Sequence, residues 1–87
     1  MTHAPMRSRA TAGKVLCTLR QSRGLTGRAL AERTGVDQST LARAEAGTVR
    51  LSPDALERVL HELDPDQRDR WAIICAMAWD HRYTRLL

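Results

Sequence analysis

Glycine and proline divide this chain of 87 residues into segments that each have the length of a short helix. Gly24, Gly35 and Gly47 each follow an apolar segment, at the place where a glycine commonly ends a helix. Pro53 and Pro65 stand near the start of later segments, where the missing N–H of proline costs nothing. No segment alternates apolar and polar residues with the period of two that marks a strand. The sequence therefore predicts an all-α fold.

Each predicted helix follows a side chain that can cap it, and each repeats apolar residues at the helical period. The expected helices run from about Thr11 to Ser22, over 27–34, over 38–46, over 53–63 and from Pro65 to about 78. The expected caps are Thr11, Thr26, Asp37, Ser52 and Asp64, the last in a capping box with Gln67. We expect one compact five-helix unit, with four helices over 11–63, a fifth helix and C-terminal extension over 64–87, and a flexible basic arm over 1–10.

Aliphatic side chains must fill most of the core, because the three aromatic residues all lie in the last fifth of the chain. The expected core residues of the first four helices are Ala12, Val15, Leu16, Leu19, Leu30, Ala31, Val36, Leu41, Ala44, Leu56, Val59, Leu60 and Leu63. The fifth helix is expected to present the apolar stripe Trp71, Ile74, Cys75 and Ala78, with Trp71 and Ile74 completing the core.

The charge is unevenly distributed along the chain. Residues 1–51 carry nine cations and three anions, whereas residues 52–87 carry five cations and seven anions. A basic first half is typical of a surface that meets a polyanion, although a solvated arginine-rich surface would give the same pattern. Charge alone therefore leaves nucleic-acid binding open.

Cysteine and histidine offer no pattern of a cofactor or metal site. Cys17 and Cys75 each fall in an apolar helical segment, so we expect reduced core residues rather than a disulfide. His3, His61 and His81 lack ligand spacing, and no CxxC pair occurs. We therefore expect no cofactor and no metal. No apolar run approaches the length of a membrane span, and the first residues lack an apolar signal region, so we expect a cytoplasmic protein that does not bind a membrane.

The second and third predicted helices, with "TGV" between them, have the lengths and the short glycine turn of a helix-turn-helix. In such a motif the second helix places its N-terminal side chains against base edges in the DNA major groove. Gln38, Ser39 and Arg43 fall on the outer side of this helix, and Gln and Arg match the edges of adenine and guanine. Thr40 lies at the margin and is expected to contact phosphate. "DQST" alone could equally be an ordinary polar helix start.

The order of these segments resembles the Xre/Cro/lambda-repressor family of DNA-binding domains. The resemblance covers about residues 13–63 and rests on "LRQSRGLT", "LAERTGVDQSTLARAEAG" and the apolar fourth helix. It implies a compact five-helix domain that binds double-stranded operator DNA, usually as a two-fold dimer, and mostly in transcriptional repression. It also places Gln38, Ser39 and Arg43 at the base-contacting positions.

The resemblance implies further roles for single residues. Thr26 would hold the N-terminus of the second helix against a phosphate, and Arg50 would contact the DNA backbone. Family members usually carry Gln after that threonine; this chain has Gly27, so that contact is absent unless Arg28 substitutes for it. Arg20 and Glu45 match a pair that often forms a buried ion pair in the family.

Dimerisation is expected to depend on the fifth helix and the tail, because the chain has no separate dimerisation domain. Trp79, Tyr83, Leu86 and Leu87 are the candidates for a self-interface, since aromatic residues are enriched in interface cores. The alternative is that these residues cover the core of a monomer. The basic arm with Arg7 and Arg9 could follow the DNA backbone, or could be a tail that makes no contact.

Two functions fit these features. The first is a sequence-specific DNA-binding transcriptional regulator, and the family resemblance implies a repressor. The second is a protein-interaction module or antitoxin-type regulator that binds a protein partner through its fifth helix. An enzyme is not expected, because no nucleophile, base and orienting group occur at a useful spacing.

Overall fold

The computed structural model describes residues 6–77 and residue 86, and it describes side chains over 12–76 and at 86. The described part is all-helical, as the sequence predicts. Its elements are α1 (Met6–Ser22), α2 (Gly27–Thr34), α3 (Gln38–Glu45), α4 (Pro53–Leu63) and α5 (Gln67–Met77).

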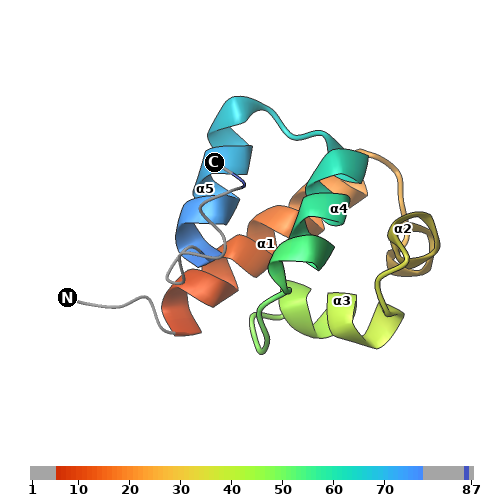
Figure 1. Ribbon diagram of the computed structural model, residues 1–87, viewed down its shortest axis with the longest axis horizontal. Coiled ribbons are helices and arrows are strands. Elements are labelled where there is room, and N and C mark those ends of the chain that lie inside the picture. Colours follow the sequence, from red (N-terminus) through yellow and green to blue (C-terminus); the bar gives the residue numbers. More distant parts are fainter. Residues whose placement is uncertain (1–5, 78–85, 87) are drawn as a thin grey trace.

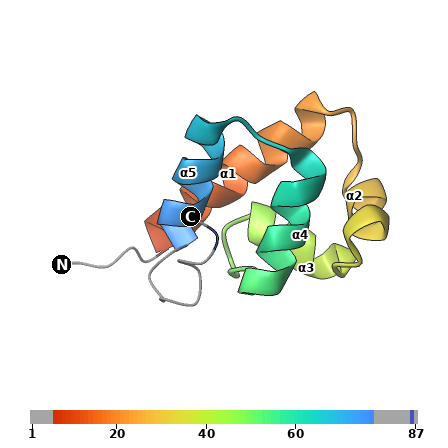
Figure 2. The ribbon, with the colours of Figure 1, turned by 45° about the horizontal axis from the view of Figure 1, so that its top comes forward.

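The helices pack with α2 and α3 toward one end of the molecule and α5 toward the other (Figure 1). The long helix α1 packs along α5 and against α3, and α2 packs against both α3 and α4. A second view keeps the same separation between α5 and the α2–α3 pair (Figure 2). The helix-turn-helix and the fifth helix therefore occupy different surfaces.

The three central helices begin at the predicted caps. The hydroxyl of Thr26 accepts a hydrogen bond from the amide of Ala29 at 3.0 Å. The carboxylate of Asp37 accepts from the amide of Thr40 at 3.1 Å, and Ser52 caps α4 in the same way. These side chains satisfy backbone donors that have no partner within the first helical turn. The predicted starts of α2, α3 and α4 are thus confirmed.

The first helix begins at Met6, five residues before the predicted Thr11. No glycine or proline occurs between Met6 and Ala12, and arginine and alanine are good helix formers, so nothing in this stretch ends the helix. The second half of the arm expected over 1–10 is therefore helical, and Arg7 and Arg9 belong to α1.

The fifth helix uses a different cap from the one predicted. The carboxylate of Asp66 accepts from the amide of Asp69 at 2.8 Å. Asp64 instead ends α4 in the left-handed conformation, with φ 45° and ψ 60°. The prediction of an Asp64–Gln67 capping box is wrong because Asp64 takes this left-handed conformation at the end of α4, and so lacks the extended backbone of an N-cap.

The core is aliphatic, as predicted, over the first four helices. Its buried members are Ala12, Leu16, Leu19, Leu30, Val36, Leu41, Ala44, Leu51, Ala55, Leu56, Val59, Leu60, Leu63, Ile73, Ile74 and Leu86. Val15 and Ala31 are partly buried against this cluster.

The face that α5 turns toward the core differs from the predicted stripe. Ile73 and Ile74 are buried, whereas Trp71 is 57 % exposed and Cys75 is exposed. Trp71 therefore does not complete the core, and Cys75 is not a core residue. Residues 71–77 are all apolar, so no polar position within them marks which side faces outward. Ala78 lies outside the described residues.

Leu86 belongs to the core of the monomer. Its side chain is 4 % exposed, and its carbonyl accepts a hydrogen bond from the Arg70 guanidinium at 3.5 Å. The expectation that Leu86 serves a dimer interface is wrong, because its apolar surface is already buried within the chain. Trp79, Tyr83 and Leu87, the other three candidates, lie outside the described residues.

Candidate nucleic-acid interface

The turn between α2 and α3 is fixed by its own hydrogen bonds. Gly35 is left-handed, with φ 74°, and its amide donates to the carbonyl of Ala31 at 2.8 Å. A side chain at this φ would be strained, so glycine suits the turn. The buried hydroxyl of Thr34 donates to the Leu30 carbonyl at 2.8 Å and accepts from the Val36 amide at 3.3 Å. Val36 then enters the core and anchors the start of α3.

The two faces of α3 have opposite character. Leu41 and Ala44 are fully buried, which holds the helix against the domain. Gln38, Ser39 and Arg43 are all exposed. The structure thus places the three predicted base-contacting side chains on the solvent side of a helix that lies at the edge of the molecule (Figure 1).

An ion pair ties the C-terminal end of α3 to α1. Arg20 donates from Nε to one carboxylate oxygen of Glu45 at 2.8 Å and from Nη2 to the other at 3.0 Å. The two side chains are only 14 % and 13 % exposed. Hydrogen bonding to Glu45 raises the pKa of the Arg20 guanidinium above its ordinary value, against an opposing effect of burial. The geometry is the two-pronged arrangement in which arginine binds a carboxylate most strongly.

Arg20 also reaches the loop that leads into α2. Its Nη1 donates to the carbonyl of Leu25 at 2.9 Å, directly before the cap residue Thr26. One guanidinium therefore connects the end of α3 to the loop before α2. This contact links the two parts of the motif expected to meet DNA.

Gly13 marks a close crossing of α1 and α3 that the sequence analysis does not identify. A Cβ placed on Gly13 would meet the backbone oxygen of Ala44, and would lie 2.5 Å from the backbone oxygen of Glu45. Only a residue without a Cβ allows this approach. A glycine inside a helical pattern is the sequence signal for such a contact.

The predicted backbone-contacting residues differ in how they are presented. Thr26 is exposed at the N-terminus of α2. The Arg28 side chain is 79 % exposed and lies 3.7 Å from Glu32, a weak pair on the surface of α2. Thr40 and Arg50 are each half-buried, and the hydroxyl of Thr40 lies 3.5 Å from the Asp37 carboxylate. The N-terminus of α2 is thus the more open of the two backbone-contacting regions.

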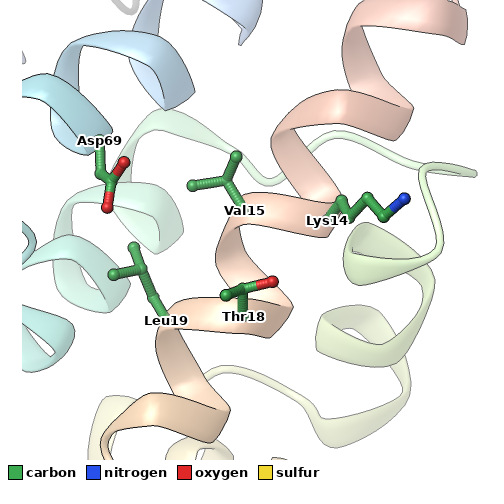
Figure 3. A pocket seen from close by; sticks show the side chains of 5 residues that line it. All are labelled: Lys14, Val15, Thr18, Leu19 and Asp69. Carbon is green, nitrogen blue, oxygen red and sulfur yellow. The ribbon is translucent and has the colours of Figure 1, made fainter.

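A pocket of about 290 Å³ lies between α1 and α5. Val15 and Leu19 face α5 and Asp69, whereas Lys14 points away from Asp69 (Figure 3). The polar groups of this pocket therefore do not converge on one point, whereas those of a small-molecule site do.

Among the described residues, no three of His, Cys, Asp and Glu gather as metal ligands. No described helix combines the length and apolar character that crossing a membrane requires.

Comparison with known proteins identifies the family. The family described as "Helix-turn-helix domain" matches residues 11–71, which is more than half of the chain. Neither the curated proteins nor the solved structures yield a match. The matched region spans α2, α3 and the turn between them, together with the helices that support them. This chain belongs to the helix-turn-helix domain family, consistent with its resemblance to Xre/Cro/lambda-repressor proteins.

Proposed function

We propose that this protein is a sequence-specific DNA-binding transcriptional regulator whose α3 enters the major groove. One observation carries the proposal: Gln38, Ser39 and Arg43 are exposed together on a helix whose opposite side is buried. A helix held in this way presents its polar side chains without exposing core residues. The family to which the chain belongs supports the same function.

The side chains provide the chemistry for reading bases. The Gln38 amide both donates and accepts, which matches the edge of adenine, and the Arg43 guanidinium offers two donors to guanine. Each such paired contact favours the correct base by about 1–3 kcal/mol. Ser39 adds a hydroxyl that can bond to several bases.

Phosphate contacts supply the remaining affinity in this proposal. The exposed N-terminus of α2 offers backbone amides and the positive end of the helix dipole, beside Thr26 and Arg28. Thr40 in α3 and Arg50 in the loop that follows α3 are also assigned to contacts with the DNA backbone. Binding should therefore weaken steeply as salt concentration rises.

We propose that the protein binds a palindromic operator as a homodimer and represses transcription in the cytoplasm. One domain of this size contacts few bases, and a dimer doubles the contact area. The exposed Trp71 on α5 supports an interface at that end of the molecule, because a large aromatic side chain is costly to leave in water. Trp79, Tyr83 and Leu87 remain candidates for the same interface.

A second candidate function is a regulator that binds a different protein through α5. The same exposed Trp71 favours this function. Gly27 favours it as well, because glycine lacks the side-chain amide of the glutamine with which family members bind phosphate. This alternative predicts weak DNA binding without sequence preference, and a tryptophan that a partner covers.

Selection of bound duplexes from a random pool by the purified full chain tests the proposal. The expected result is a palindromic motif with half-site centres about 34 Å apart, and with affinity that falls steeply between low and physiological salt. Binding without any enriched motif would contradict a sequence-specific regulator and favour the protein-binding alternative.

A further inference from the structure

Asp37 places a negative charge at the N-terminus of α3, the helix that is proposed to enter DNA. The residue is exposed, and among the described residues no cation lies within 4.0 Å of its carboxylate. Glu45, the other carboxylate of this helix region, is neutralised by Arg20 at 2.8 Å. Asp37 thus differs from Glu45, because no cation in the described part of the chain neutralises it.

Capping does not require this charge. Thr26 and Ser52 cap α2 and α4 with neutral hydroxyl groups, through bonds of 3.0 and 3.2 Å. Ser, Thr and Asn are all good capping residues, so a neutral side chain could serve at the start of α3 as well. A carboxylate near phosphates is repelled by them, which lowers affinity for every DNA sequence. The helix dipole favours a negative charge at an N-cap, and Asp66 caps α5 with a carboxylate as well. Asp37 differs from Asp66 in its place directly before the proposed base-reading side chains, where its charge would also act on the bound DNA.

The carboxylate of Asp37 keeps the capacity to accept more hydrogen bonds. Its Oδ2 accepts from the amide of Thr40 at 3.1 Å and lies 3.5 Å from the Thr40 hydroxyl. Its Oδ1 accepts no hydrogen bond from the described residues. An ionised carboxylate accepts through both oxygens and donates through neither. Asp37 can therefore cap α3 and accept a hydrogen bond from a base at the same time.

We infer that Asp37 is a fourth base-reading side chain and that it selects cytosine; this inference rests on the proposed function. Cytosine presents an N4 amino donor in the major groove and no acceptor there. Guanine presents N7 and O6 and thymine presents O4, all of which are acceptors that repel a carboxylate. Adenine presents both the N6 amino donor and the acceptor N7, so it matches a carboxylate less well than cytosine does. Asp37 lies directly before Gln38, so the cytosine should adjoin the base pair that Gln38 reads.

The test compares the base preferences of the full chain with those of Asp37→Asn, by selection from random duplexes and by titration of single-base variants of the selected site. Asn keeps the cap and removes the charge. Glu32→Gln is the matched control, because it removes one exposed carboxylate from α2, outside the base-reading helix. A second variant, Asp37→Ser, keeps a neutral cap of the kind that α2 and α4 use.

The parent is expected to prefer cytosine at one position in each half-site. Both Asp37 variants should lose about fivefold or more of that preference, with the other positions unchanged. Glu32→Gln should change affinity equally for all sequences. If both Asp37 variants keep the base preferences of the parent and melt near its melting temperature, the inference is overturned and Asp37 serves only as the N-cap of α3. A parent without any motif would instead contradict the proposed function itself, so the two failures are distinguishable.

Discussion

At the scale of single residues, the N-terminus of α2 has open space at Gly27. A Cβ placed there meets no atom within 4 Å, and the glycine is not in the left-handed region. Gly27→Gln should therefore fold normally and restore an amide beside Thr26 that can bond to phosphate. We expect about 1 kcal/mol tighter binding, roughly fivefold, for all sequences alike.

Titration of specific and non-specific duplexes at fixed salt measures this effect. Gly27→Ala is the matched control, because it adds the Cβ without the amide and should leave affinity close to that of the parent. A glutamine variant that binds DNA no better than the alanine variant would mean that this position does not face phosphate.

Local chemistry makes several of these residues predictable from the sequence. A cap must lie three residues before the amide that it satisfies, so Thr26, Asp37 and Ser52 can be identified from the chain alone. Asp64 and Asp66 could each cap α5 by that rule. Asp64 takes the left-handed conformation that ends α4, which leaves Asp66 as the cap, and nothing in the local sequence marks that choice.

At the scale of elements, the position of α3 depends on its ion pair with α1. Arg20→Ala would leave the largely buried Glu45 carboxylate without its ion-pair partner and would remove the hydrogen bond to the Leu25 carbonyl. We expect a loss of about 3 kcal/mol in the free energy of unfolding. Thermal and urea unfolding measure it, and DNA affinity at a temperature where both proteins are folded should change less.

The surface pair Arg28–Glu32 provides the control for that measurement. Its side chains are mostly exposed, so Arg28→Ala should change the free energy of unfolding by no more than about 0.5 kcal/mol. Equal melting temperatures for Arg20→Ala and the parent would show that the pair does not hold α3 in place.

The crossing of α1 and α3 gives a second prediction at this scale. Gly13→Ala would bring a methyl group against the backbone of Ala44 and Glu45, which cannot move as a side chain could. We expect a destabilisation of about 1–3 kcal/mol, although alanine is the better helix former. Unfolding by urea measures it, with Gly27→Ala as the control at an open position. Greater stability in Gly13→Ala than in the parent would contradict this close approach.

The helices differ in how well their faces can be predicted. In α4 the apolar residues recur at the helical period between charged ones, so Leu56, Val59, Leu60 and Leu63 identify its buried side. In α5 seven consecutive apolar residues hide the period, and only the packing against α1 selects Ile73 and Ile74 over Trp71. The exposed face of α3 was predictable for the same reason as that of α4.

At the scale of the whole molecule, the helix-turn-helix and α5 lie at separate ends (Figure 1). This separation allows one end to bind DNA while the other binds a second protein chain. We expect Trp71→Ser to weaken self-association about tenfold or more, because exposed aromatic residues often dominate an interface. The monomer should keep its stability, since Trp71 is already 57 % exposed.

Sedimentation velocity over a range of concentrations, with and without operator DNA, measures this association. Gln67→Ala, an exposed change on the same helix, serves as the control. If the parent and Trp71→Ser sediment alike at every concentration, Trp71 does not contribute to a dimer.

The central claim is that the exposed side of α3 reads bases, and the most direct measurement is the base preference of variants on that side. Gln38→Ala and Arg43→Ala should each relax preference at one position of the selected site, by about 1–3 kcal/mol, while retaining non-specific binding. Arg28→Ala should weaken binding to all sequences alike. Preference profiles of Gln38→Ala and Arg43→Ala that match the parent at every position would contradict the account.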